Sequence, residues 1–353
     1  MTRFEPPRHS PVLTAFATLG LVVLVVLILY HGQVVLIPMA FAVVAAFVIW
    51  TAVTWLGTLP LIGRTPLWLR HMVILAMFTV ALTALLVQIR VNAEVLVARL
   101  PTYQANVMQL VARLDAQFGL NDDWGGGLST LMPGPMNLQA LARSVAGTLG
   151  NLGGLIVVIF FYTAFLLVEY TGFVKKLHLA FHNRADVDHA LAVARAVNGR
   201  IGGFLAIKTL INIILGAVSY AALLWLEVDL AGFWAIVIGV LNYVPYLGSA
   251  AGVAFPVLMT LAQTGSIREA VVATVVLSAI QVVIGLLVEP RLIGARINLS
   301  PLMVLVSLAS WYALWGLPGA VLAMPMTVII LTIMGGFDAT RPVAVLLSNS
   351  GKV

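Results

Sequence analysis

The sequence predicts an all-α, polytopic integral membrane protein with two re-entrant or broken helical hairpins arranged as an inverted repeat. Of its 353 residues, 61% are hydrophobic and 9% are charged, whereas a soluble domain is about one quarter charged. Several runs with little or no charge have the length of roughly 20 residues that crosses the hydrocarbon core of a bilayer. Two further runs are too long for one crossing, so each must fold back on itself.

The single spans follow one another in a regular order. Residues 12–30 come after Arg3 and Arg8, as the apolar part of a signal peptide does. The run is long, however, and no small-x-small cleavage pattern ends it, so we expect a retained helix. Further spans are expected at 34–56, 72–89, 149–168, 201–226 and 270–288. The predicted units are an N-terminal three-helix segment (1–90), a non-cytoplasmic helical insertion (91–148), a fourth span with a charged cytoplasmic helix at 172–199 (149–200), a duplicated transport unit (201–337, as 201–267 and 270–337) and a cytoplasmic tail (338–353).

The insertion is predicted to be partly an amphipathic helix. Its apolar residues recur at helical spacing between Tyr103 and Phe118. Breaks are expected at Asn121–Gly127 and at Pro133–Pro135, where glycine, proline and asparagine gather.

The two overlong runs are Leu230–Ile267, with 38 residues, and Ile297–Phe337, with 41. A straight helix of the first length would measure about 57 Å, nearly twice the membrane core. Proline and glycine interrupt the runs at Pro245–Gly248 and Gly316–Gly319. Each run is either a re-entrant hairpin or two short full spans. The polar and aromatic groups beside the breaks favour hairpins, because freed backbone must be buried in protein or line a wet cavity.

The basic residues indicate the orientation. Arginine and lysine precede the first span and follow the second, the fourth and the 270–288 span, whereas Glu227 and Asp229 lie in an opposite loop. The positive-inside rule then places both termini in the cytoplasm, and we expect a multi-pass protein of the bacterial inner membrane. The net charge of +6 therefore suits contact with anionic membrane lipid, and no nucleic-acid partner is expected.

A duplication is indicated by a shift of 69 residues. This shift places Asn212 on Gln281, Gly216 on Gly285, Tyr243 on Tyr312, Tyr246 on Trp315 and Pro256 on Pro325. Each unit holds one full span followed by one broken run that returns to its starting side, so the two units would have opposite orientations. Inverted repeats with interrupted helices indicate a transporter site near the middle of the bilayer.

The candidate substrate-binding residues lie mainly at the first break. Proline and glycine there expose backbone groups beside an amide, two phenols and a hydroxyl. The members of this set are Asn242, Tyr243, Pro245, Tyr246, Gly248 and Ser249. The alternative is a structural kink whose polar groups bond one another.

Further candidates flank this break. At the second break, Trp315, Gly316 and Gly319 are candidates that would close the site. The aromatic rings there could stack on a sugar-like solute or could belong to an interfacial aromatic belt. Lys208 lies inside a span and shares a helix face with Asn212, which Gln281 matches in the second unit. Lys208 could also reach the membrane surface.

Glu289 and Arg291 are candidates for a gate or for proton coupling, with an interfacial charge pair as the alternative. His178, His182, Asp186 and His189 share one helix face, but no ligand set that would close a metal site is visible, and we expect no metal. No phosphate loop, zinc-protease motif or cofactor motif is present, so we expect neither a cofactor nor an enzyme.

The chain resembles the autoinducer-2 exporter family of permeases at three motifs. Asn-Tyr-Val-Pro-Tyr-Leu-Gly at 242–248 is similar to Asn-Phe-Ile-Pro-Tyr-x-Gly of that family. Glu-Pro-Arg-Leu-Ile-Gly at 289–294, with Asn-Leu-Ser-Pro at 298–301, is similar to its Pro-x-x-x-Gly…His-Pro segment. Trp-Gly-Leu-Pro-Gly-Ala at 315–320, with Pro325, is similar to its Trp-Gly-x-x-Gly-x…Pro ending. Tyr243 and Ser300 depart from the pattern, which more often has Phe and His there.

The resemblance implies a homo-oligomeric permease, with a pentamer as the expected form, that works by alternating access of its hairpin-bearing half. The leading hypothesis is gradient-driven efflux of a small polar metabolite or signal such as autoinducer-2. The alternatives are a sodium–proton antiporter, as some relatives resemble, and a membrane scaffold that transports nothing.

Overall fold

The computed structural model describes residues 11–58, 65–118, 138–180, 183–293 and 298–351, and these residues are almost entirely helical. The helices are α1 (Pro11–His31), α2 (Gln33–Leu56), α3 (Leu67–Phe118), α5 (Leu138–Ala180), α6 (Arg184–Trp225), α7 (Ala231–Leu241), α8 (Leu247–Thr264), α9 (Ile267–Val283), the π-helix η1 (Ile284–Val288), α10 (Glu289–Ile293), α11 (Pro301–Gly335) and α12 (Arg341–Leu347). The β-structure found in these ranges is one isolated bridge between Leu299 and Ser348.

The helices confirm the prediction of a multi-pass, all-α membrane protein. Six of the described helices are long and apolar enough to cross a bilayer, namely Gln33–Leu56, Leu67–Leu114, Arg184–Trp225, Leu247–Thr264, Ile267–Ile293 and Pro301–Gly335. Shorter apolar helices lie at Phe16–His31 and Gly153–Glu169. α1 exposes large apolar side chains over most of its length, as a helix surrounded by lipid does.

The long helices continue further than the predicted spans. α3 has 52 residues, so the predicted span at 72–89 and the predicted insertion helix form one continuous helix. Its length along the axis is about 78 Å. The predicted helix at 172–199 is instead divided, because α5 ends at Ala180 and α6 begins at Arg184. Asn183 caps this start by accepting a hydrogen bond from the Ala185 amide. The breaks predicted at 121–127 and 133–135 lie outside the described residues.

The chain reverses direction within both overlong runs. In the first run, α7 and α8 pack against each other on either side of a turn at residues 242–246. In α11 the backbone leaves the helical conformation at Gly316, with φ 63° and ψ −142°. Ser307 Oγ then donates to the Ala323 carbonyl at 3.1 Å, although a straight helix would place these residues about 24 Å apart.

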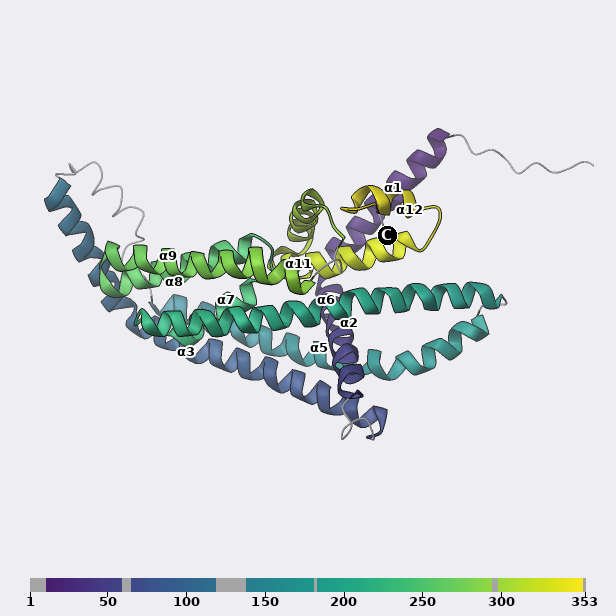
Figure 1. The fold of residues 1–353 in the computed structure, drawn as a ribbon, viewed down its shortest axis with the longest axis horizontal. Coiled ribbons are helices and arrows are strands. Elements are labelled where there is room, and N and C mark those ends of the chain that lie inside the picture. The colour runs from purple at the N-terminus through teal and green to yellow at the C-terminus, as the bar shows by residue number, and fades with distance from the viewer. Residues whose placement is uncertain (1–10, 59–64, 119–137, 181–182, 294–297, 352–353) are drawn as a thin grey trace, which may run out of the picture.

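α6 is the central helix of the described structure. It packs against α2, α7, α9 and α11, and Figure 1 shows it beside α9 with α2 crossing steeply. Ile201, Ile211, Leu215 and Leu223 along α6 are fully buried. Ile211, Leu215 and Leu223 belong to the same apolar core as Trp234 and Ile238 of α7. The turn at residues 242–246, here called the first turn, therefore lies against one face of α6.

Candidate functional site

The first turn is a tight reversal between α7 and α8. Tyr246 takes a positive φ of 61°, which is uncommon for a residue with a side chain, and the Leu247 amide bonds the Pro245 carbonyl at 2.6 Å. Gly248 lies so close to the other arm that a β-carbon there would overlap the Leu241 carbonyl oxygen. The close approach of the two arms therefore explains why glycine occupies this position.

A hydrogen-bonded chain of polar side chains joins this turn to α6. Asn242 Nδ2 donates to Asn212 Oδ1 at 2.8 Å, and Ser249 Oγ donates to Asn242 Oδ1 at 3.3 Å. Asn212 and Asn242 are each only 5% exposed. Beside them, the hydroxyls of Thr209 and Tyr243 lie 2.7 Å apart. Buried amides cost free energy unless they are hydrogen-bonded, so these bonds offset the cost of placing polar side chains within an apolar core.

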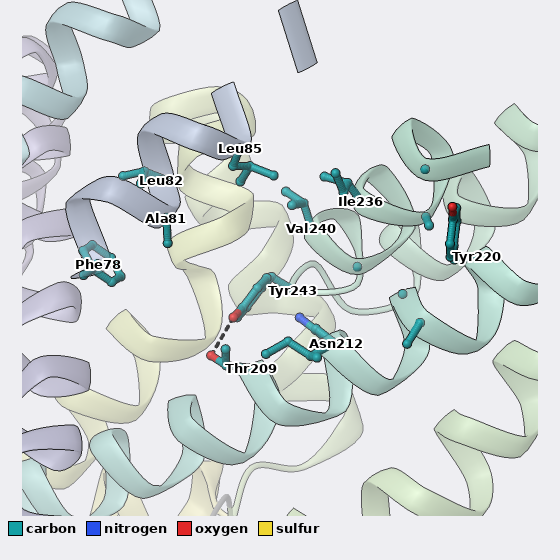
Figure 2. Close-up of a pocket in the computed structure, with 16 residues that line it drawn as sticks. Phe78, Ala81, Leu82, Leu85, Thr209, Asn212, Tyr220, Ile236, Val240 and Tyr243 are labelled. Atoms are coloured by element: carbon teal, nitrogen blue, oxygen red, sulfur yellow. Dashed lines mark hydrogen bonds between the residues drawn. The ribbon is translucent and has the colours of Figure 1, made fainter. Parts of the chain in front are cut away.

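One end of the polar chain opens into a groove between α3, α6 and α7. The groove has a volume of about 670 Å³ and is lined largely by apolar side chains such as Phe78 and Leu82. Its polar lining includes Thr209, Asn212 and Tyr243, which Figure 2 shows together at one end of the groove. Asn212 Nδ2 is buried near the Tyr243 hydroxyl and makes no hydrogen bond of normal geometry.

The other end of the polar chain opens into a second groove, between α8 and α9. This groove has a volume of about 480 Å³, and its polar lining consists of Ser249, Thr274, Ser278 and Gln281. Gln281 Nε2 is buried without a hydrogen-bond partner. The chain from Asn212 through Asn242 to Ser249 therefore links two grooves on opposite sides of the first reversal.

An ion pair lies one helical turn before Asn212. Lys208 Nζ contacts Glu289 Oε1 at 2.6 Å, and the two side chains are 8% and 28% exposed. Glu289 follows directly after the π-helix η1, which lies between α9 and α10. Such π-helical turns often occur at functional sites, because the additional residue changes which side chains face inward.

The second reversal is packed against α1 and α2. A β-carbon at Gly319 would overlap the Trp311 carbonyl oxygen, so the two arms approach closely here as well. Trp315 is buried, and its indole donates to the Leu29 carbonyl of α1 at 2.9 Å. Val244 of the first turn belongs to the same apolar cluster as Trp311 and Trp315, so the two reversals meet through apolar contacts.

The structure brings together part of the predicted site. Asn212, Asn242 and Ser249 are bonded to one another, Tyr243 and Gln281 line the adjoining grooves, and Lys208 pairs with Glu289. Tyr246, in contrast, is 57% exposed, and Arg291 is exposed rather than paired with Glu289.

Sequence reasoning missed three hydroxyl residues, Thr209, Thr274 and Ser278. Thr209 adjoins Lys208, and Ser278 precedes Gln281 by one turn. A search for hydroxyls next to the predicted intramembrane polar residues would have found Thr209 and Ser278.

The histidines do not form a metal site in the described part of the chain. No group of three or more His, Cys, Asp or Glu side chains with metal-binding geometry is found there. His189 instead contacts the Gly336 carbonyl through Nε2 at 2.7 Å, and His182 lies outside the described residues.

Comparison with known proteins gives the same picture of a membrane transporter. The chain is 34% identical over 166 residues to the AI-2 transport protein TqsA of Escherichia coli K12. It is 30% identical over 196 residues to a protein of Borreliella burgdorferi, and 29% identical over 188 residues to YhhT of Escherichia coli K12. The names of both of these proteins describe them provisionally as transport proteins.

These matches cover 47%, 55% and 53% of this chain and 48%, 54% and 52% of the relatives, so the chain spans about half the length of the curated relatives it matches. The profile described as AI-2E family transporter matches residues 19–337, which include the three motifs and both reversals. The chain belongs to the AI-2E transporter family.

Proposed function

We propose that this protein is a secondary transporter that exports a small polar metabolite or signal, such as autoinducer-2, across the bacterial inner membrane. The observation that carries the proposal is the buried chain of Asn212, Asn242 and Ser249, which joins two grooves across a break in the helices. Polar side chains within the membrane-crossing part of a protein usually mark the path of a substrate or an ion.

Two buried amide donors support a solute that carries hydrogen-bond acceptors. Asn212 Nδ2 and Gln281 Nε2 are buried without a hydrogen bond of normal geometry, one in each groove. Each unsatisfied buried donor costs about 1–3 kcal/mol, so a hydroxyl or carbonyl oxygen on a solute would be favoured at either position. The relative TqsA is named for transport of AI-2, a small molecule, and this name supports the same class of solute here.

The two grooves also support the proposed inverted repeat of re-entrant hairpins. The α6 residues that line the first groove include Thr209, Asn212 and Ile213. The α9 residues that line the second groove include those 69 positions later, Ser278, Gln281 and Val282. The shift that aligns the two sequence units therefore also pairs three residues of one groove with three of the other. Inverted repeats with a site at their interface are typical of transporters that work by alternating access.

Three further elements of the proposal rest on the family relationship and on the loop charges. The second reversal, with Trp315, Gly316 and Gly319, would close the path from the other repeat. The protein would act as a homo-oligomer, with a pentamer expected. Both termini would face the cytoplasm, following the positive-inside rule.

The experiment that tests the proposal is release of labelled autoinducer-2 from proteoliposomes, with and without an imposed proton or sodium gradient. Wild-type protein should give gradient-sensitive release, and Asn242→Ala should lower its rate at least about tenfold, since it removes two buried hydrogen bonds. Asn92→Ala is the matched control, because Asn92 is partly exposed on α3 and its side chain bonds the Gln88 carbonyl of the same helix. Equal rates for Asn242→Ala and Asn92→Ala would contradict the proposed path.

The Lys208–Glu289 pair favours a second candidate function, sodium–proton antiport. Protonation of Glu289 would release Lys208, and such an exchange could couple proton entry to cation exit. The test is sodium uptake driven by a pH gradient in wild type and in the double variant Lys208→Met/Glu289→Gln, which removes both charges together. Uptake at the wild-type rate in the double variant would exclude coupling through this pair, and no uptake by the wild type would exclude antiport altogether.

A further inference from the structure

The C-terminal half of α3 is bonded to the base of the first hairpin, at the end remote from the Asn242 turn. Three residues of α3, Arg99, Tyr103 and Asn106, recur at intervals of four and three and so share one helix face. This face meets the short loop between α6 and α7 and the last turn of α8. These two segments are the start and the end of the hairpin in the chain.

Asp229 receives two of the contacts. Arg99 Nη1 lies 2.6 Å from Asp229 Oδ2, and the Tyr103 hydroxyl donates to the same oxygen at 2.9 Å. Tyr103 is only 6% exposed, and it belongs to the apolar core that also contains Val228 and Trp234. The contact therefore combines a surface ion pair with a buried aromatic ring. We expect it to stabilise the junction more than an exposed ion pair alone would.

Gln263 ties the two ends of the hairpin together. Its Oε1 accepts from the Asp229 amide at 2.7 Å, and its Nε2 donates to the Glu227 carbonyl at 2.8 Å. Asn106 then fixes this junction to α3, because its Nδ2 donates to the Gln263 carbonyl at 2.6 Å and to the Ala262 carbonyl at 3.2 Å.

The backbone of the loop also depends on these contacts. Glu227 and Leu230 have positive φ values of 54° and 58°, which are unfavourable for residues with side chains. Two such residues within four positions persist only where their surroundings hold them. The bonds from Gln263, Tyr103 and Arg99 supply that restraint.

We propose that Arg99, Tyr103 and Asn106 are positioning residues for transport, which anchor the base of the first hairpin while its Asn242 turn moves against α6. This inference rests on the proposed function for its role in transport, but the anchoring itself can be measured without any solute. Loss of the anchor frees the base, so Asn242 loses its register with Asn212. The base does not open during the transport cycle.

The chain has no cysteine, so a reversible covalent anchor can be introduced cleanly. A β-carbon at Gly265 would lie 3.9 Å from the β-carbon of Asn106, which is within the range that a disulfide spans. The pair Asn106→Cys/Gly265→Cys is therefore closed by oxidation and opened by a reductant. Because Gly265 has a positive φ of 59°, Asn106→Cys/Gly265→Ala is the matched control for backbone strain.

The first measurement is hydrogen–deuterium exchange of the α7 amides in detergent-solubilised protein. Asp229→Ala should speed this exchange about tenfold, the effect of losing one charged hydrogen bond. Adding the cysteine pair to Asp229→Ala should restore slow exchange when oxidised but not when reduced. Tyr103→Phe, which removes only the hydroxyl, serves if Asp229→Ala does not fold. Unchanged exchange in the variant used, or no rescue by oxidation, overturns the anchor.

The second measurement is autoinducer-2 release from proteoliposomes. The oxidised cysteine pair in the otherwise wild-type protein should release the label at least as fast as its reduced form, because the disulfide replaces the bonds that Asn106 makes. In the Asp229→Ala background, oxidation should restore release. If oxidation of the cysteine pair in the wild-type background stops release of the label, the base must open during transport, and the proposal is overturned. If no variant moves the label, the proposed function fails, while the exchange experiment still decides whether the base is anchored.

Discussion

The ion pair between Lys208 and Glu289 predicts an unequal response to removal of its two charges. Glu289→Gln leaves the Lys208 cation unpaired, with its side chain only 8% exposed. Breaking a buried pair from one side costs about 3–5 kcal/mol, because the remaining charge has lost both water and partner. Lys208→Met leaves Glu289, whose side chain is 28% exposed and can be hydrated, so we expect a smaller cost of about 1–2 kcal/mol.

The double variant separates the charge effect from the loss of contacts. Lys208→Met/Glu289→Gln leaves no unpaired ion, so its stability should return to within about 1 kcal/mol of wild type. At about 2 °C per kcal/mol for a chain of this size, Glu289→Gln alone should lower the Tm by about 6–10 °C. Thermal unfolding in detergent, followed by tryptophan fluorescence, measures all four proteins. The reasoning is refuted if Lys208→Met is the less stable single variant, or if the double variant is no more stable than Glu289→Gln.

Two further predictions concern the reversals. Gly248→Ala places a β-carbon against the Leu241 carbonyl, so it should lower stability by about 1–3 kcal/mol and slow transport. The control Gly153→Ala, which has open space, should change neither, and a transport rate that Gly248→Ala leaves unaltered would argue against a tight reversal. Trp315→Phe loses the hydrogen bond to the Leu29 carbonyl, so the Tm should fall by about 2 °C while transport persists. An unchanged Tm in Trp315→Phe would contradict a stabilising role for this hydrogen bond.

The apolar runs predicted where the chain can cross a membrane but not where its helices end. Hydropathy stopped the third span at residue 89, because Arg90 follows, yet α3 continues to Phe118. A charge ends the lipid-facing part of a helix without breaking its backbone hydrogen bonds, so helix length and span length are separate quantities. The opposite error occurred at 172–199, where the cap at Asn183 divides a stretch that charge patterning had treated as one helix.

The candidate site was predictable where it depends on local spacing. Lys208 and Asn212 share a face because they are four residues apart, and the Pro245–Gly248 break placed Asn242 beside them in an unusual turn. The partner of Lys208 was not predictable in this way. Glu289 is 81 residues away from Lys208, and Arg291, two residues after Glu289, was the more obvious partner for Glu289 from sequence. Tyr246 was placed in the site by composition, but the left-handed backbone of the turn leaves its ring exposed.

The π-helix before Glu289 has a consequence for comparison with relatives. A π-helical turn is equivalent to one inserted residue, so the side chains after it are rotated by about 100° relative to an uninterrupted α-helix. A relative without this insertion could keep Glu-Pro-Arg in its aligned place and still turn a different residue toward the lysine. Identity at aligned positions therefore does not establish that two family members share this ion pair. That correspondence has to be judged from helical register, with η1 as the point where the register changes.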